Sequence, residues 1–356
     1  MSKVLVIGAG GVGVIAALSL WFKRESDISL VVRSDYDKVL KHGYTIESCD
    51  YGHLEGWKPD HVYSTVEDAA ADANNKGYDY VVVTTKNIID GPADSRVPNI
   101  IRPVLEKNKK LHGAQLTTHI LLIQNGIDIE KEIWAEFPSE EYKYTVLSGI
   151  QLIGSTKIGA GHISQIGKDH LSCGAFDPQD TAAVHAANEF VRMYNNEGHN
   201  FVEFDPRVRY SRWKKLLYNA AINTSTALVG LDVPRCLEFG VDKKSTESEL
   251  FHPAMREIIA IAASEGIIIE EEFITMFTEI TRKKVFKPSM CVDREKGQLM
   301  ELEVILGNPI RIAKENGVPT PTLSMLYNLL VLVQAKLKEQ KGLLKFDEVT
   351  ASLLDK

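Results

Sequence analysis

A glycine-rich turn near the start of the chain constrains its fold more than any other feature. Gly8, Gly10 and Gly13 form a G-x-G-x-x-G motif between the β-branched run of residues 4–7 and the apolar residues 14–22. This order predicts a strand, a tight turn and a helix. Glycines let a pyrophosphate approach the unpaired N–H groups that begin a helix. The candidate phosphate-binding turn is Gly8, Ala9, Gly10, Gly11, Val12 and Gly13, with a turn that binds no ligand as the alternative.

The same stretch also has a membrane interpretation. Residues 4–22 carry no charge and lie between basic residues, so their length alone would suit a signal peptide or a membrane span. Each glycine inside the run would cost a helix about 1 kcal/mol relative to alanine, which argues against both. We therefore expect no membrane segment.

Charge and cysteine usage exclude further classes of protein. The chain has 41 Lys and Arg against 48 Asp and Glu, and its net charge of -7 is unlike the basic excess of a general nucleic-acid binder. The four cysteines are scattered and form no C-x-x-C pair. We expect a cytoplasmic protein with no metal site and no nucleic-acid partner.

Strand and helix patterns divide the chain of 356 residues, whose length suits two domains, into two parts. Apolar strand runs alternate with helical patterns in the first part, which indicates a parallel sheet, and glycine-separated β-rich runs over residues 144–176 indicate antiparallel hairpins. Helical periodicity dominates after residue 206, including one helix over residues 210–229. The predicted fold is an α/β domain with a mostly parallel sheet over residues 1–205, followed by an all-α domain over residues 206–356.

Polar residues follow the predicted strands at the edge where open α/β sheets bind ligands. Arg33 follows the second strand, where an acidic residue would bind the ribose 2′-hydroxyl of NAD, and its planar fork suits the 2′-phosphate of NADP. Asp35 keeps the NAD alternative open, and a solvated surface arginine is the other interpretation of Arg33. Lys86 and Asn125 follow two further strands and join the candidate cofactor site.

A second group of candidates lies in the helical part. Lys215, Asn219 and Asn223 are spaced i, i+4 and i+8, so we expect them along one side of a helix. They form either a solvent-facing stripe or the polar wall of a cleft in which Lys215 donates a proton. Ser289 begins a predicted helix, where capping is the alternative role, and Glu301 lies in an amphipathic run where a surface glutamate would be normal.

Together these stretches resemble the ketopantoate reductase (2-dehydropantoate 2-reductase) family over nearly the whole chain. The resemblance implies an N-terminal Rossmann domain, a helical domain, and an active site in the cleft between them. It implies that Lys215 is the catalytic lysine and Glu301 its acidic partner, that Asn219, Asn223 and Ser289 bind the substrate, and that Arg33 binds the 2′-phosphate of NADPH. Lys86 and Asn125 would lie near the nicotinamide ribose and the reacting carbon.

The implied reaction is NADPH-dependent reduction of a branched 2-oxo acid, ketopantoate first, in pantothenate biosynthesis. Two departures concern the substrate side: Phe286 stands where the family often has an asparagine, and residues 232–233 replace another. Phe286 favours, as an alternative, a mandelate-dehydrogenase-like relative that acts on a bulky or aryl 2-oxo acid. A non-catalytic NADP-sensing protein is the third hypothesis. The helical part could support a homodimer.

Overall fold

The computed structural model describes residues 1–73, 76–113 and 115–354. Its contacts divide the chain into two compact units. The sheet unit comprises Met1–Lys86, Arg96–Gln124 and Ile129–Val208. The helical unit comprises Asn87–Ser95, Asn125–Asp128 and Arg209–Lys356. A single domain boundary between residues 205 and 206 stays a prediction. The contacts group two short early segments, Asn87–Ser95 and Asn125–Asp128, with the later helices.

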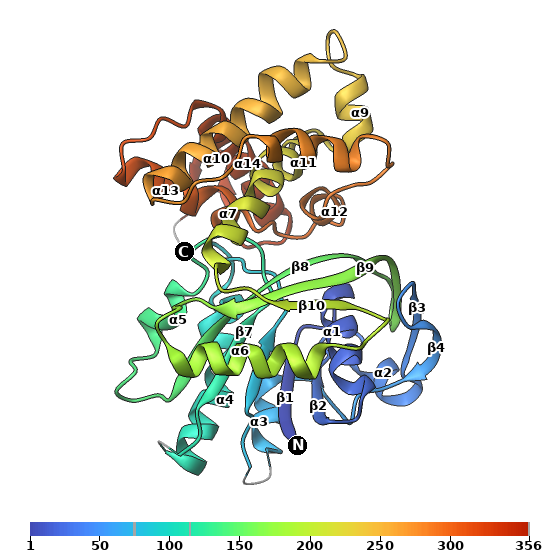
Figure 1. Ribbon diagram of the computed structural model, residues 1–356. Coiled ribbons are helices and arrows are strands. Elements are labelled where there is room, and N and C mark those ends of the chain that lie inside the picture. The colour runs from blue at the N-terminus through green and yellow to red at the C-terminus, as the bar shows by residue number, and fades with distance from the viewer. Residues whose placement is uncertain (74–75, 114, 355–356) are drawn as a thin grey trace. The chain divides into compact units, whose positions relative to one another are not determined.

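The sheet unit is built on one large sheet, which Figure 1 shows with α6 crossing one of its faces. The strand order is β4-β3-β9-β8-β7-β6-β1-β2-β5, with β10 beside β9. All the neighbouring strands pair in parallel except β3 with β4 and β8 with β9. The mostly parallel sheet expected from the sequence is therefore confirmed.

The bounds of the sheet unit's elements follow. The strands are β1 (Ser2–Ile7), β2 (Ser26–Val31), β3 (Tyr44–Ser48), β4 (Gly52–Trp57), β5 (His61–Tyr63), β6 (Tyr80–Val83), β7 (Thr118–Leu122), β8 (Tyr144–Gly159), β9 (His162–Ala175) and β10 (Phe201–Phe204). The helices are α1 (Gly11–Phe22), α2 (Tyr36–His42), α3 (Val66–Ala71), α4 (Val97–His112), α5 (Lys131–Glu136) and α6 (Thr181–Tyr194).

The apolar start of the chain forms β1 and α1, as its β-branched run and its helical residues predict. Both elements belong to one buried core, to which β2 and α6 also contribute. The glycine turn is shorter than predicted, because α1 begins at Gly11 and not at residue 14. Small residues at the start of α1 permit this early beginning, since Gly11 and Gly13 are buried against neighbouring backbone.

The strands β8 and β9 form one long hairpin, which corrects the expectation of several. Gly154 and Gly167 lie opposite each other inside it and not at turns. A Cβ on Gly154 would lie 2.9 Å from the nitrogen of Gly167, so the two backbones approach too closely for side chains. The pairing register shifts beside Gly154, which marks an irregularity that a glycine accommodates.

Helices make up most of the helical unit, and its largest fully buried side chains are Trp213 and Phe251. The helix expected over residues 210–229 is interrupted, because a π-helical turn over Asn219–Asn223 divides it. A small hairpin near the C-terminus also departs from an all-helical expectation. None of the helices in the described residues is long and apolar enough to cross a membrane.

The bounds of the helical unit's elements complete the fold. The α-helices are α7 (Val208–Tyr218), α8 (Thr224–Val229), α9 (Val233–Glu238), α10 (His252–Ser264), α11 (Glu272–Arg282), α12 (Ser289–Glu295), α13 (Asn308–Glu315) and α14 (Pro321–Gln340). The shorter elements are η1 (Ala93–Ser95), η2 (Asn219–Asn223), η3 (Thr246–Phe251), η4 (Glu303–Gly307), β11 (Phe346–Asp347) and β12 (Ser352–Leu353).

Candidate functional site

The glycine turn between β1 and α1 has the geometry of an anion cradle. A Cβ on Gly13 would lie 1.8 Å from the carbonyl oxygen of Gly8, so this close turn requires glycine. A Cβ on Gly10 would meet nothing within 4 Å, so the turn is open on that side. No side chain caps the start of α1, and its first turn has no acidic residue. These features fit the pyrophosphate of a dinucleotide.

The end of β6 supports this turn through Thr84, which sequence reasoning missed. The Thr84 hydroxyl donates to the carbonyl oxygens of Ile7, at 3.1 Å, and of Gly8, at 3.0 Å. Lys86 follows two residues later in a half-buried loop. The parallel pairing of β6 with β1 could have suggested that Thr84 contacts the glycine turn, because the ends of the two strands meet at one edge of the sheet.

The end of β2 carries two candidates in different environments. Arg33 is exposed directly after the strand, whereas Asp35 is 8% exposed. The Asp35 carboxylate accepts from the backbone N–H of Gly161 at 3.0 Å and from Lys157 Nζ at 3.0 and 3.1 Å. Burial opposes its ionisation, but these hydrogen bonds and the lysine charge outweigh burial and lower the pKa of Asp35.

The helical unit gathers two candidate asparagines beside a buried glutamate, Glu301. Glu301 is 4% exposed, so its interpretation as a surface glutamate is wrong. Its Oε2 accepts from Asn125 Nδ2 at 3.1 Å, and Asn219 Nδ2 lies 3.5 Å from Asn125 Oδ1. A carboxylate buried among amides is an arrangement that can hold a cation or polarise a donor.

Asn87 joins this group and was missed by sequence reasoning. Its backbone N–H donates to Glu301 Oε1 at 3.0 Å, and the residue is 1% exposed. Within the described residues, neither polar atom of its side-chain amide has a hydrogen-bond partner. Buried amides are normally bonded, so this one is available to a ligand. Its position directly after Lys86 was the only signal in the sequence.

Asn223 and Ser289 form a second polar contact of the helical unit. Asn223 Nδ2 donates to Ser289 Oγ at 3.3 Å, and Asn223 Oδ1 accepts from the Met290 N–H at 2.9 Å. Pro288, not Ser289, occupies the N-cap of α12, and the Asn223 side chain bonds the Met290 N–H in its first turn, so the capping alternative for Ser289 is wrong.

The π-helical turn η2 carries both asparagines of the predicted stripe. Asn219 and Asn223 are its first and last residues and are both buried, so neither belongs to a solvent-facing stripe. Lys215 is half-buried in the last turn of α7, four residues before Asn219. Such π-helical turns occur frequently at functional sites.

The loop that carries Asn125 is bonded closely to the helical unit. The Ile127 N–H donates to the Val304 carbonyl at 3.1 Å, and the Ile127 carbonyl accepts from Asn308 Nδ2 at 2.8 Å. Arg212 donates to the Gly126 carbonyl at 3.0 Å. A Cβ on Gly126 would lie 2.5 Å from Val304, so glycine is required for this approach.

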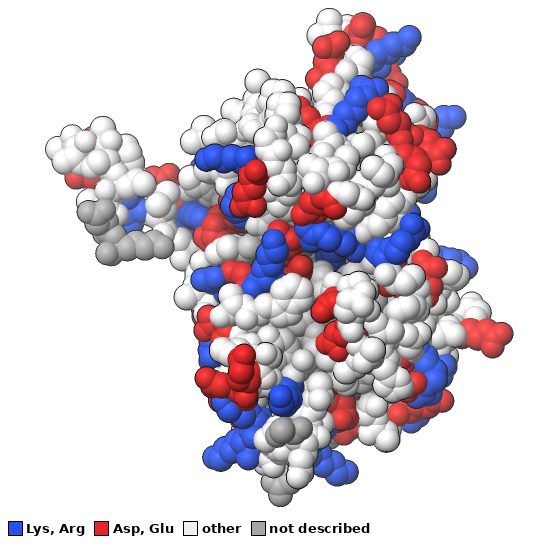
Figure 2. Space-filling view, turned by 60° about the vertical axis from the view of Figure 1, so that its left-hand side comes forward, with Lys and Arg blue, Asp and Glu red and all other residues white. Residues whose placement is uncertain are grey.

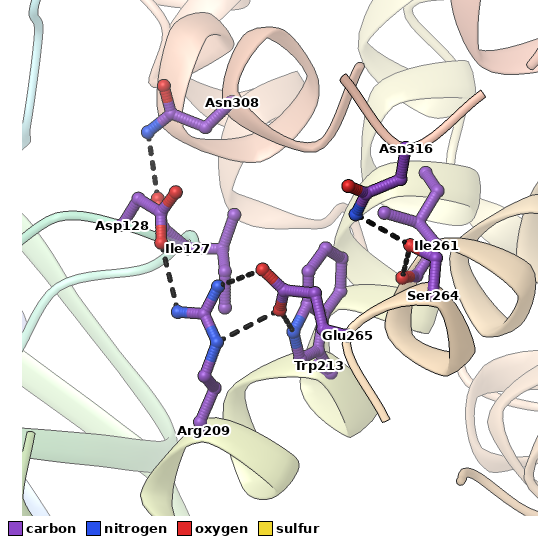
Figure 3. Close-up of polar contacts among 9 residues, drawn as sticks. All are labelled: Ile127, Asp128, Arg209, Trp213, Ile261, Ser264, Glu265, Asn308 and Asn316. Carbon is purple, nitrogen blue, oxygen red and sulfur yellow. Dashed lines mark hydrogen bonds and ion pairs between the residues drawn. The ribbon is translucent and has the colours of Figure 1, made fainter. Parts of the chain in front are cut away.

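An ion-pair network ends this loop, as Figure 3 shows. Arg209 at the start of α7 donates to Asp128 at 2.9 Å and to both oxygens of Glu265 at 2.6 and 2.9 Å. Trp213 Nε1 donates to Glu265 at 2.9 Å. The network therefore ties the loop to the helix on which Lys215 lies, which no spacing in the sequence indicated.

The two positions that depart from the family's substrate-side asparagines differ in their surroundings. Phe286 is 40% exposed, so its ring is accessible. Asp232 is 1% exposed and accepts from the Arg235 N–H at 2.9 Å as the N-cap of α9. Asp232 therefore has a structural role in this chain.

Charged side chains are mixed on the face drawn in Figure 2. Lys and Arg lie in small groups among Asp and Glu, and no single sign covers this face. The net charge of -7 therefore does not form a uniform acidic surface there. Local groups of positive charge are what an anionic ligand needs on an acidic protein.

Comparison with known proteins bears on these observations. A protein of Saccharomyces cerevisiae described as uncharacterized is 87% identical over 355 residues and covers 100% of each chain. The crystal structure of 2-dehydropantoate 2-reductase from Methylococcus capsulatus is 29% identical, with a TM-score of 0.76 over 94% of this chain and 97% of that one. A ternary structure of D-mandelate dehydrogenase with NADH and anilino(oxo)acetate is 19% identical, with a TM-score of 0.74 over 95% and 100% of the two chains, and shows a shared fold.

Family models match both parts of the chain. Residues 4–178 match the model described as ketopantoate reductase PanE/ApbA, and residues 207–334 match that of its C-terminal part. These matches confirm the resemblance inferred from the glycine turn and the lysine and asparagine positions. The chain belongs to the ketopantoate reductase family, whose members are oxidoreductases that act on CH–OH groups.

Proposed function

We propose that this protein reduces a branched 2-oxo acid to the 2-hydroxy acid with NADPH, and that ketopantoate is its first candidate substrate. The observation that carries the proposal is the set of buried Glu301 and Asn219 with half-buried Asn125, beside the helix of Lys215. Family membership supports the reaction class, since relatives of this chain are described as 2-dehydropantoate 2-reductases.

The sheet unit would hold the cofactor, which supplies the hydride when it is bound. The residues from Gly8 to Gly13 would receive the pyrophosphate at the start of α1. Arg33 would pair with the 2′-phosphate, and Lys86 would lie toward the nicotinamide ribose. The open side of the glycine turn at Gly10 and the uncapped helix start support this assignment.

The helical unit would supply the proton and bind the acid. Reduction places negative charge on the carbonyl oxygen, and the Lys215 ammonium would stabilise that charge and then donate its proton. Glu301 would keep Lys215 protonated, and Asn125 would hold the Glu301 carboxylate in place. The substrate's carboxylate and hydroxyl groups would be bound by Asn219, Asn223 and Ser289.

Lys215→Ala tests the catalytic part of the proposal. Loss of the proton donor should lower turnover of ketopantoate by about 10²-fold or more, with the affinity for NADPH nearly unchanged. Stopped-flow NADPH oxidation and equilibrium binding measure the two quantities. Lys214→Ala is the matched control, because the neighbouring lysine lies over aromatic rings of α7 and α11. Turnover that Lys215→Ala leaves unchanged would exclude Lys215 as the acid.

A bulky or aryl 2-oxo acid is the second candidate substrate, and the accessible ring of Phe286 favours it. A panel of 2-oxo acids in a steady-state NADPH assay separates the two candidates. Good turnover of an aryl acid without turnover of ketopantoate would overturn the first choice and leave the reaction class intact. The same assay tests a non-catalytic NADP sensor, which would turn over none of them.

Cellular setting and assembly remain predictions beside this proposal. A cytoplasmic protein in pantothenate biosynthesis is expected from the resemblance, and loss of the gene should then create a requirement for pantoate. A homodimer is expected to double the mass of 39.7 kDa in analytical ultracentrifugation.

A further inference from the structure

Lys157 on the β8–β9 hairpin reaches the end of β2, where the ribose of a dinucleotide is read in this fold class. Its Nζ lies 3.0 Å from Ser34 Oγ and 3.0 and 3.1 Å from the two oxygens of Asp35. The lysine is separated from these residues by more than 120 positions in the sequence. Only the folded hairpin brings it there.

The same strand also passes the phosphate turn. A Cβ on Gly11 would lie 2.5 Å from the carbonyl carbon and oxygen of Ser155, two residues before Lys157. The Ser155 hydroxyl oxygen is buried and has no hydrogen-bond partner among the described residues. This part of β8 therefore extends from the start of α1 to the end of β2, alongside the path a bound dinucleotide would take.

Asp35 presents an electrostatic problem that Lys157 resolves. A carboxylate at this edge suits the 2′-hydroxyl of NAD and would repel the 2′-phosphate of NADP. Here the carboxylate accepts hydrogen bonds from Lys157, from the Gly161 N–H at 3.0 Å and from Ser34 Oγ at 3.0 Å. Its charge is compensated and its oxygens are occupied within the protein.

Positive charge remains on the outer side of this cluster. The Lys157 side chain is 33% exposed, whereas that of Asp35 is 8% exposed, and Arg33, two residues before Asp35 in the sequence, is exposed. A phosphate that approaches from solvent would therefore meet the guanidinium, the Ser34 hydroxyl and the ammonium before the carboxylate. Two cations and a hydroxyl are a common phosphate-binding set.

We propose that Lys157 is the second cation of the 2′-phosphate site and that, by compensating Asp35, it sets the preference for NADP over NAD. The proposal rests on the cofactor site of the proposed function and adds a specificity-determining residue from the hairpin. It explains how an arginine and an aspartate coexist at the end of β2.

Binding measurements on the full-length chain test this role without any turnover. Isothermal titration calorimetry with NADP⁺ and with NAD⁺ gives both dissociation constants for each variant. Lys157→Met should weaken NADP⁺ binding by about 10-fold, the effect of losing one hydrogen bond to a charged group, and change NAD⁺ binding by less than about 3-fold. Lys157→Arg should keep most of the NADP⁺ affinity. Lys168→Met, on the exposed part of the same hairpin, is the matched control and should change neither constant.

A double variant separates two effects of Lys157: compensation of the Asp35 charge and direct contact with the 2′-phosphate. Asp35→Asn added to Lys157→Met removes the uncompensated carboxylate, so NADP⁺ affinity should rise relative to Lys157→Met alone. If NADP⁺ affinity does not rise, the proposal that Lys157 compensates the charge of Asp35 is overturned. Lys157→Met that weakens both cofactors equally, or neither, would overturn the specificity role, and a thermal melt of each variant confirms that it is folded.

Arg33→Ala distinguishes failure of this proposal from failure of the cofactor assignment. Loss of NADP⁺ affinity in Arg33→Ala with none in Lys157→Met would refute only the role of Lys157. A wild-type protein that binds NAD⁺ as tightly as NADP⁺ would refute the assignment of NADPH and the role of Lys157 together.

Discussion

At the residue scale, the buried amides differ in how many of their hydrogen bonds the protein itself provides. Asn223 satisfies both ends of its amide within the protein, through Ser289 and the Met290 N–H. Asn87 satisfies neither end among the described residues, although it is 1% exposed. Replacing Asn223 should therefore affect stability first, whereas replacing Asn87 should affect ligand binding first.

Asn223→Ala should destabilise the protein by about 1–3 kcal/mol, because it leaves the buried Met290 N–H without its acceptor. Urea unfolding followed by circular dichroism measures the change. Asn328→Ala is the control: this exposed asparagine bonds the Ser324 carbonyl of its own helix, and its replacement should cost less than about 0.5 kcal/mol. Equal costs for the two variants would contradict the structural role of Asn223.

Asp35 should make stability depend on pH in the acidic range. Its pKa in the folded protein lies below the ordinary value, since hydrogen bonds and Lys157 outweigh the effect of burial. An acid with a lowered folded pKa stabilises the protein above its unfolded pKa of about 3.9 and loses that contribution as pH falls through the folded value. The stability advantage of wild type over Asp35→Asn should thus be full at pH 7 and shrink below about pH 4. Urea unfolding at several pH values measures it, and a constant advantage would contradict this linkage.

At the scale of elements, the loop after β7 shows how a short segment acquires a precise position. Four of its backbone and side-chain groups bond to Val304, Asn308, Arg212 and Arg209. Asp128 has a φ of 57°, a left-handed conformation that a non-glycine residue adopts only where its surroundings hold it. The loop thereby presents Asn125 to Glu301.

Arg209→Met should loosen this loop. The change removes the ion pair between Arg209 and Asp128, which is 9% exposed, and should destabilise the protein by about 1–3 kcal/mol. Turnover should fall as well, because Asn125 would no longer be held against Glu301. Arg256→Met provides the control, since its contact with Glu271 is 3.9 Å long and exposed and should contribute less than about 1 kcal/mol. Thermal unfolding and NADPH oxidation report both effects, and normal turnover in a folded Arg209→Met variant would refute the positioning role.

The elements predicted from the sequence are those with strong local patterns. The β-branched runs that became β1, β2 and β6 and the periodic run that became α14 carry their structure in neighbouring residues. The π-helical turn at Asn219–Asn223 was not predictable, because residues 210–229 carry one continuous helical periodicity and no local signal marks a single π turn inside it. Gly154 and Gly167 looked like turns because glycine marks both turns and close strand contacts.

The site was predictable where residues stand at strand ends or along one helix face. Asn125 and Asn219 were found in this way, whereas Glu301 was named through the family resemblance, and the structure brings the three together. Asn87 and Lys157 were missed because their partners are distant in sequence: Glu301 lies 214 residues from Asn87. Such pairings depend on tertiary packing, which no local pattern encodes.

At the scale of the whole molecule, the helical unit is assembled from three stretches of the chain. Asp90, in the first of them, accepts from Lys338 at 2.7 Å and from Gln334 at 3.3 and 3.4 Å on α14. The loop Asn125–Asp128 is the second stretch. The C-terminal part of the sequence therefore does not contain all the partners of its own buried polar groups.

A fragment of residues 209–356 should consequently be much less stable than the intact chain. It lacks the acceptors of Arg212 and Asn308 in the loop and leaves buried Gln334 without Asp90. We expect no cooperative thermal transition for this fragment in circular dichroism, with the full-length protein as the reference. A cooperative transition at the melting temperature of the full-length protein would show that the two early segments contribute little.

The composite origin of the helical unit also limits how such a protein can be rearranged by recombination. A gene fusion that joined residues 207–356 to a foreign nucleotide-binding domain would transfer Lys215 and Glu301 but leave Asn87 and Asn125 behind. The hybrid would inherit a glutamate without the two neighbours that now hold its oxygens. The two parts of the gene therefore cannot be exchanged separately without loss of these contacts, although the two parts of the protein differ in fold.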